Sequence, residues 1–288
     1  MIPEPAQSDQ LAPQVPQMEA SEFAAIAEYA KITFGLHLPL AKKEMVFARL
    51  IKRLRRLGLR DFSTYLSYIQ RKDNAVERSE FLSALTTNVT HFFRENHHFD
   101  FLRDKLMPDF ITKARAGQRV RFWSAGCSAG QEPYSLAMLI LESCPDAAQL
   151  DIKILASDID PRILDTARTG EYPVDQRIAI PAALHKFLKP AHANDMFTVD
   201  TEPRKLISFA ELNLIEDWPM RQGFDVIFCR NVAIYFDAPT QSHLWHRLCQ
   251  QTMSGGHLFI GHSERLSGPA LAQMRSVGIT VYVNTSSP

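Results

Sequence analysis

The chain has 288 residues, of which 45% are hydrophobic, so it is long enough for two modest domains and is not globally disordered. Its 32 basic and 32 acidic residues balance, so bulk charge points to no particular partner. The four cysteines are widely spaced without a C-x-x-C pair, which argues against a disulfide framework and favours a reducing compartment. The sequence shows neither a signal peptide nor an apolar run of about 18 residues. We therefore expect a cytoplasmic protein without membrane insertion.

The first part of the chain predicts a tail and a helical domain. Residues 1–18 are rich in proline and glutamine, which indicates a disordered tail. Apolar residues then recur at helical spacing in four segments, and Gly58 suits the end of the second. We expect a helical N-terminal domain over residues 19–88 and a linker over residues 89–99.

After residue 100, apolar runs of strand length alternate with helical stretches. The runs are Val120–Trp123, Ile152–Ala156, Leu206–Phe209, Val226–Cys229 and His257–Ile260. This alternation is typical of an α/β domain with a parallel sheet and crossover helices. The last apolar segment, Ile279–Val283, is expected to add an antiparallel strand at an edge of this sheet.

Residues 190–210 break this rhythm and predict a small antiparallel β insertion. Met196–Val199 is expected as one strand, because Phe197 and Val199 alternate with polar neighbours. A turn through Thr201–Pro203 would lead to Leu206–Phe209 as the second strand. The alternative is a small lid that only packs on the sheet.

The stretch WSAGCSAGQEPYS, from Trp123 to Ser135, is expected as a turn between the first strand and a helix. Gly126 and Gly130 permit positive φ and close approach of a ligand to the backbone. No lysine follows Gly130, which excludes a P-loop, and Glu132 would repel a pyrophosphate. S-adenosylmethionine carries cationic groups and no phosphate, so it suits an acidic Glu132 better.

Polar residues follow two further predicted strands. Asp158 ends the second strand, roughly where nucleotide-binding sheets place the acid that binds the ribose hydroxyls. It could instead cap the helix that Pro161 opens. Arg230 and Asn231 end the fourth strand and would lie over the centre of the site, although asparagine after a strand is often only a turn former.

Five stretches of the chain resemble the family of CheR-type chemoreceptor glutamate methyltransferases. They are ALTTNVTHFFRE (84–95), WSAGCSAGQEPYSLA (123–137), ASDIDPRILDTARTGEYP (156–173), FDVIFCRNVAIYF (224–236) and GGHLFIGHSE (255–264). The resemblance covers roughly residues 20–284. It implies a helical N-terminal domain and a Rossmann-like methyltransferase domain over residues 100–288, with a small antiparallel β insertion.

The resemblance implies a reaction and its partners. A methyl group would pass from S-adenosylmethionine to glutamate side chains of chemoreceptors during chemotaxis adaptation, giving glutamate methyl esters and S-adenosylhomocysteine. The partners would be the cytoplasmic helices of a chemoreceptor and, as in some members, the receptor's C-terminal peptide bound at the β insertion. We expect a monomer. A methyltransferase of this fold acting on nucleic acid and a non-catalytic S-adenosylmethionine-binding protein that docks on receptors are the alternatives.

The resemblance also implies site residues. Arg94 and Tyr235 match positions near the transferred methyl group. Without the resemblance, Arg94 could pair with Glu95 or Glu132, and Tyr235 could be a core aromatic residue beside Phe236. The expected cofactor-binding residues, to which Arg230 is added from its strand-end position, are Asn88, Thr90, Arg94, Ala125, Glu132, Asp158, Asn213, Leu214, Arg230 and Asn231. Two departures from the family are Ala129, where a small hydroxyl residue is frequent, and Gln131, where Glu is frequent.

A basic helix precedes these motifs. The resemblance implies that its cations Lys52, Arg53, Arg55 and Arg56 dock on an acidic receptor surface, which a basic face on a chain of balanced charge would suit. A solvated helix face or a nucleic-acid surface would carry a similar charge, but no nucleic acid is expected. His91, His97 and His98 lie close in sequence, but no cysteine or carboxylate spacing completes a metal site, so no metal is expected.

Overall fold

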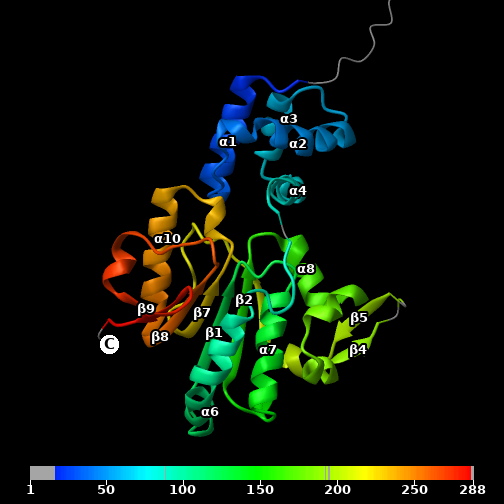
Figure 1. Ribbon diagram of the computed structural model, residues 1–288. Coiled ribbons are helices and arrows are strands. Elements are labelled where there is room, and N and C mark those ends of the chain that lie inside the picture. The colour runs from blue at the N-terminus through cyan, green and yellow to red at the C-terminus, as the bar shows by residue number, and fades with distance from the viewer. Residues whose placement is uncertain (1–16, 88, 192, 194, 287–288) are drawn as a thin grey trace, which may run out of the picture. The chain divides into compact units, whose positions relative to one another are not determined.

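The computed structural model describes residues 17–87, 89–191, 193 and 195–286, which form two compact units (Figure 1). The first unit extends to Ala30 and resumes over Leu38–Leu85, and the second comprises Lys31–His37 and the chain from Thr86 onwards. The division at residue 85 lies close to the predicted one, whereas the transfer of residues 31–37 to the second unit was not predicted. The expected tail falls largely outside the described residues, but Met18 at its end is buried.

The first unit is helical, as predicted. Its helices are α1 (Ala20–Phe34), α2 (Lys43–Leu57), α3 (Phe62–Ile69) and α4 (Ala75–Leu85), with a 3-10 turn at Leu40–Lys42 before α2. The apolar face of α2 buries Val46, Leu50 and Leu54 completely. Gly58 ends α2 in the left-handed region, with φ 67°, which a residue without Cβ adopts at little cost.

Arg53 lies inside the first unit and not on its exposed basic surface. Its guanidinium donates to both carboxylate oxygens of Glu77, at 3.0 and 2.6 Å, and pairs with Glu80 at 2.9 Å. The Arg53 side chain is only 14% exposed. The exposed cations beside it are Lys52, Arg55 and Arg56. The inclusion of Arg53 in a docking surface is therefore corrected, because this bidentate pair instead holds α2 against α4.

The second unit is built on a seven-stranded sheet in the order β6-β2-β1-β7-β8-β10-β9. The first five strands in this order are parallel, and β10 is antiparallel to its neighbours. The strands are β1 (Val120–Ala125), β2 (Ile152–Asp158), β6 (Ile207–Glu211), β7 (Phe224–Cys229), β8 (Thr252–Ile260), β9 (Met274–Gly278) and β10 (Val281–Asn284).

The expected antiparallel strand at the end of the chain exists as β10, but its predicted position at the sheet edge is wrong. It lies between β8 and β9, and β9 forms the edge. The sequence of β9, MRSVG, exposes its central residues and carries no apolar run, so it was not recognised as a strand.

Helices cover both faces of the sheet (Figure 1). Alternate side chains of β1 point to opposite faces, so Phe122 belongs to the core cluster that includes Leu136 of α7, while Trp123 belongs to the cluster that includes Trp245 of α10. Burial on both faces explains why the strands read as nearly continuous apolar runs. The helices are α5 (His97–Phe101), α6 (Met107–Arg115), α7 (Gln131–Ser143), α8 (Pro161–Thr169), α9 (Thr201–Lys205) and α10 (Ala238–Gln251), with a π-helical turn at Leu102–Leu106. Within the described residues, no helix is both long enough and apolar enough to span a membrane.

A second, antiparallel sheet has three short strands in the order β3-β5-β4. They are β3 (Glu171–Pro173), β4 (Leu188–Pro190) and β5 (Met196–Val199). The β insertion is therefore real, but its predicted span of residues 190–210 is corrected: it begins earlier, and Leu206–Phe209 contributes to β6 of the main sheet. The predicted turn at Thr201–Pro203 opens α9. Strands of three residues that end in proline are too short to give a periodic signal.

Candidate functional site

The carboxyl ends of four parallel strands meet at one edge of the main sheet. Ala125 of β1 is in register with Ser157 of β2, and Asp158 is in register with Glu211 of β6. Strand order reverses between β1 and β7, and ligands of such sheets bind outside the carboxyl ends at this point. The register therefore brings to one edge the predicted residues Ala125, Asp158, Asn213, Leu214, Arg230 and Asn231.

The turn after β1 is held in a path that needs its two glycines. Gly126 and Gly130 have φ values of 78° and 93°, where residues with a Cβ are strained. A Cβ on Gly126 would lie 2.4 Å from a methyl carbon of Val232, and one on Gly130 would lie 2.9 Å from the Tyr172 hydroxyl. The turn is thus packed against its neighbours and presents a bare backbone, as the predicted ligand requires.

Asp158 closes this turn from the next strand. Its carboxylate accepts hydrogen bonds from the amides of Ser128 at 2.8 Å and Asp160 at 3.1 Å. Asp160, and not Asp158, caps α8 by accepting from the amide of Arg162 at 3.0 Å. Burial raises the pKa of Asp158, which its two amide donors oppose. Because a carboxylate has about four acceptor positions, Asp158 keeps capacity for the hydroxyls of a ribose.

Glu132 lies at the start of α7 and is already paired on both oxygens. The Ser124 hydroxyl donates to one oxygen at 2.6 Å, and the Arg230 guanidinium contacts the other at 3.2 Å. Burial raises the pKa of Glu132, and the charge of Arg230 acts against this rise. A cationic group of a ligand would therefore share the Glu132 carboxylate with Arg230.

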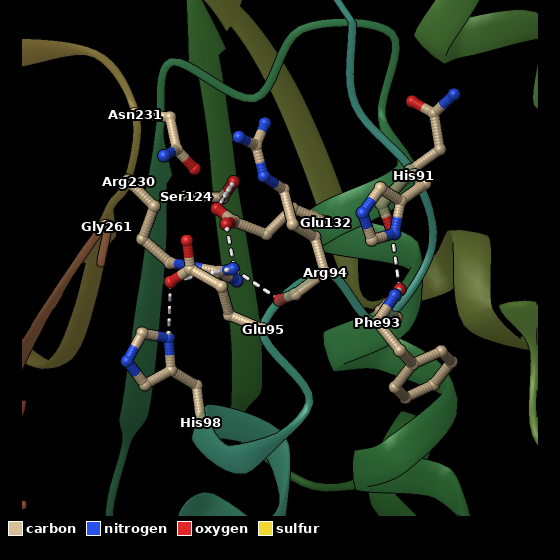
Figure 2. A network of polar contacts seen from close by, with 12 residues as sticks. His91, Phe93, Arg94, Glu95, His98, Ser124, Glu132, Arg230, Asn231 and Gly261 are labelled. Carbon is tan, nitrogen blue, oxygen red and sulfur yellow. Dashed lines mark hydrogen bonds and ion pairs between the residues drawn. The ribbon is translucent and has the colours of Figure 1, made fainter. Parts of the chain in front are cut away.

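Arg230 also holds the linker (Figure 2). It donates to the carbonyl oxygen of Arg94 and lies 3.4 Å from a carboxylate oxygen of Glu95. The linker bends sharply here, since Phe93 and Glu95 have φ values of 52° and 57°. The backbone of the linker is thereby fixed beside the strand edge.

The side chain of Arg94 points away from Glu95 (Figure 2). Its guanidinium donates to the carbonyl oxygen of Val89 at 3.2 Å, and within the described part of the chain no ion pair engages it. The alternative salt bridges to Glu95 and Glu132 are made by Arg230 instead. Of the other predicted linker residues, Thr90 is partly buried and Asn88 lies outside the described residues.

Other predicted residues have contacts within the second unit. The Tyr235 hydroxyl donates to the carbonyl oxygen of Thr87 at 2.9 Å, while its ring packs against the apolar core. Asn213 donates to the carbonyl oxygen of Thr33 at 2.9 Å, and Leu214 is buried. Tyr235 therefore holds the chain just before the linker, and Asn213 holds the last turn of α1. Their contacts with a cofactor stay predictions.

Glu264 was overlooked in the sequence, although it ends the last stretch that resembles the family. It is buried, and its carboxylate accepts from the amides of Gly261 at 2.7 Å, Asn231 at 3.0 Å and Val232 at 3.0 Å. Asn231 has φ 59°, so the turn after β7 is strained and needs these bonds. The sequence signal that could have identified it is an acidic residue four positions after Ile260, the buried end of β8.

The small sheet contacts the glycine turn through Tyr172 of β3. The Tyr172 hydroxyl donates to the carbonyl oxygen of Ala129 at 2.7 Å. Its ring lies 4.9 Å from that of Phe92 in the linker and 5.8 Å from that of Phe197 in β5. The linker, the small sheet and the turn thus share one buried aromatic cluster.

We expect Asp158→Ala to lower the affinity for S-adenosylhomocysteine at least about tenfold, because the ribose loses a charged acceptor. Isothermal titration calorimetry measures this change. The matched control is Asp160→Ala, which removes the cap of α8 and should cost only stability. Equal affinities of wild type and Asp158→Ala would remove Asp158 from the site.

We expect Tyr172→Phe to weaken S-adenosylhomocysteine binding about fivefold. The variant loses one hydrogen bond to the glycine turn, which contributes about 1 kcal/mol. Tyr134→Phe is the control, because its equally buried hydroxyl donates to the carbonyl oxygen of Ala167 in α8, at 2.9 Å. The two variants should lose similar stability in urea unfolding. If they also lost similar affinity, Tyr172 would have no particular effect on the turn.

Comparison with known proteins agrees with this geometry. The family domain described as "CheR methyltransferase, SAM binding domain" matches residues 88–283, and "CheR methyltransferase, all-alpha domain" matches residues 21–86. A probable chemotaxis protein methyltransferase of Rhizobium etli is 47% identical over 88% of this chain and 95% of its own length. Chemotaxis protein methyltransferase 2 of Pseudomonas aeruginosa is 40% identical over 91% and 92%, and the chemotaxis protein methyltransferase of Escherichia coli is 38% identical over 86% and 85%. The chain belongs to the CheR methyltransferase family, with an all-α domain followed by a domain that binds S-adenosylmethionine.

Proposed function

We propose that this chain transfers a methyl group from S-adenosylmethionine to glutamate side chains of chemoreceptors and so serves chemotaxis adaptation. One observation carries the proposal beyond family membership. The acids Glu132 and Asp158 lie at the strand edge, and the linker beside them carries the Arg94 guanidinium, which no described acid pairs. An anionic side chain of a substrate is the natural partner for such a cation.

The chemistry asks little of the protein beyond positioning. S-adenosylmethionine supplies a methyl group on a sulfonium centre. A glutamate carboxylate, with an ordinary pKa near 4.3, is already ionised at neutral pH, so no general base is needed. Its oxygen forms the bond to the methyl carbon as the carbon–sulfur bond breaks, the electron pair stays on sulfur, and no proton moves. The work of the site is to align the two reactants and exclude water.

We assign Arg94 the role of orienting the glutamate carboxylate. Its fork of N–H groups matches a carboxylate, and its present partner is only the neutral carbonyl of Val89. The Tyr235 hydroxyl donates to the carbonyl oxygen of Thr87, just before the linker. We propose that the ring or hydroxyl of Tyr235 also lies near the transferred methyl group. Arg230 is too deeply buried and too fully paired with Glu95 and Glu132 to take part in substrate binding.

The two alternative functions have weaker support. The relatives described above are named chemotaxis protein methyltransferases, which favours a receptor over a nucleic acid. A non-catalytic binding protein would not need the Arg94 guanidinium beside the binding edge. All four cysteines are free and buried, which supports our expectation of a cytoplasmic site of action.

Tritiated S-adenosylmethionine and receptor-containing membranes test the proposal. We expect label on the receptor that alkali releases as volatile methanol, as a methyl ester requires. Alkali-stable label, or label on nucleic acid, would contradict it.

We expect Arg94→Ala to bind S-adenosylhomocysteine nearly as wild type but to lose about 100-fold in turnover, because the nucleophile is no longer aligned. Arg94→Lys keeps the charge without the fork and should fall between the two. Methyl-ester formation at saturating cofactor measures the effect. Unchanged turnover in Arg94→Ala would end this assignment.

We propose that the exposed cations Lys52, Arg55 and Arg56 of α2 dock on an acidic receptor surface. Among the basic residues originally grouped with them, Arg53 is engaged by Glu77 and Glu80 and is left out. A basic patch on a chain of zero net charge suits steering toward an acidic partner.

Reversal of Lys52, Arg55 and Arg56 to Glu should lower the rate of receptor methylation about tenfold at low salt and leave cofactor affinity unchanged. A control with the same change in net charge reverses three exposed cations of the second unit: Lys105, Arg221 and Arg275. Equal rates for the two triple variants would place the docking surface elsewhere.

We propose that the small sheet offers its β4 edge to a receptor C-terminal peptide. Phe187 and Ala191 exchange backbone hydrogen bonds with the β5 side, so by alternation Leu188 and Pro190 direct their backbone groups outward. Proline has no N–H, so the exposed edge of β4 offers one donor, the N–H of Leu188, and two acceptors, the carbonyl oxygens of Leu188 and Pro190. A peptide strand could pair there, but with one donor fewer than an ordinary edge.

Titration of the receptor's C-terminal pentapeptide should therefore give binding that Pro190→Ala strengthens several-fold, because the variant restores an outward N–H. Lys189→Ala is the control, since the backbone of Lys189 faces β5. No heat of binding with wild type and Pro190→Ala would leave the sheet as a lid only.

A further inference from the structure

Three side chains at the end of the linker converge on one point. One potential ligand atom from each of Glu95, His97 and His98 lies within 4.8 Å of the other two. We call them the Glu-His-His cluster. In the sequence, His91, His97 and His98 lie close together without a carboxylate at metal-ligand spacing, because Glu95 reaches His97 and His98 only through the bend of the linker at its positive φ.

Each of these side chains has one polar atom, Glu95 Oε2, His97 Nε2 or His98 Nδ1, that is buried and has no hydrogen-bond partner among the described residues. Buried polar atoms of this kind are usually satisfied by protein, ordered water or an ion. Three such atoms within one cluster of side chains therefore point to a small ligand between them.

The hydrogen bonds of His98 define which ligand this is. Its Nε2 lies 3.1 Å from the carbonyl oxygen of Ile279 and 2.9 Å from the Thr280 hydroxyl. A carbonyl oxygen can only accept, so Nε2 carries the hydrogen, and in the neutral ring Nδ1 holds a lone pair. In that tautomer, Nδ1 and Glu95 Oε2, 3.5 Å apart, face each other as two acceptors.

This arrangement has the features of a metal site. Two imidazole nitrogens and one carboxylate oxygen are a common set of zinc ligands, and such sites leave a position open for water. The Ile279 carbonyl orients the His98 ring from behind, as outer partners of metal-bound histidines do. His262 holds the other oxygen of Glu95 through its Nδ1 at 2.8 Å and so fixes the carboxylate.

We propose that Glu95, His97 and His98 bind a transition-metal dication of the Zn²⁺ type. The metal takes the Glu95 oxygen that now lies 3.4 Å from Arg230, so it competes with the guanidinium for this oxygen. The charge of Arg230 also opposes a second cation nearby. The site therefore has moderate affinity, in the micromolar range and not that of a structural zinc site.

Titration of the chelator-treated full-length chain with Zn²⁺ tests the site without any methylation assay. We expect one micromolar site per chain by calorimetry, and a Co²⁺ absorption spectrum typical of nitrogen and oxygen ligands. His97→Ala should weaken this binding at least about tenfold. Because His97 Nε2 makes no hydrogen bond to the described residues, the variant should fold, and thermal unfolding checks this.

His91→Ala is the matched control, since His91 is an exposed histidine on the same linker and outside the cluster. It should bind Zn²⁺ as wild type does. If His97→Ala fails to fold, His97→Gln takes its place. Absence of a saturable site, or equal affinity in wild type and the His97 variant, would overturn the proposal and assign the three atoms to an ordered water.

Discussion

The guanidinium of Arg230 is a buried cation that contacts groups from separate parts of the chain. It pairs with Glu132 at the start of α7 and with Glu95 in the linker, and it donates to the backbone of Arg94. Its side chain is 2% exposed, and it also lies over the ring of Phe228, 5.9 Å from the centroid. A buried charge without partners is costly, so these groups are held in one arrangement. The linker is thereby tied to the strand edge, and among the described residues the Arg94 side chain contacts the Val89 carbonyl and no acid.

The position of Arg230 depends in turn on a buried carboxylate. Glu264 accepts three backbone amides from the turns after β7 and β8, including that of Asn231, which directly follows Arg230. Burial raises the pKa of Glu264, and the amide donors oppose the rise. The turn after β7 can hold a left-handed asparagine because these bonds offset its strain. The Glu264 side chain thus fixes the backbone of the turn that positions Arg230 and its ion pairs.

The small sheet belongs to the same support. Arg204 of α9 donates to the carbonyl oxygens of Val199, Arg168 and Thr169, which joins the end of β5 to the end of α8. Tyr172 continues this connection to the glycine turn. The small sheet is therefore part of the structure that holds the turn and is not an appendage attached by a flexible hinge. Its prolines at Pro173 and Pro190 limit pairing at its outer strands.

The sequence by itself determined the helical first unit, the parallel strands and the glycine turn. The spacing of apolar residues follows directly from which side chains are buried. The local sequence alone therefore predicted α2 with its end at Gly58, and strands β1 and β7. The strand-end positions indicated Asp158, Arg230 and Asn231, and the family motifs added Arg94. The acid at Asp158 was left open between two roles, because a strand end and a helix cap look alike in sequence.

Only the tertiary structure decided how the charges pair. Arg230 and Arg94 are both basic residues in matching stretches, yet one is buried between two carboxylates and the other is not, because strand β7 carries Arg230 under the linker. The sequence also placed Arg53 on a docking surface, because its partners Glu77 and Glu80 come from another helix and their pairing with Arg53 cannot be read from the local sequence. The small sheet was misplaced because its strands are short and pair across up to 27 residues of chain, as between Glu171 and Thr198. Pairing between distant segments leaves no periodic trace in either segment, so it is a property of the folded chain alone.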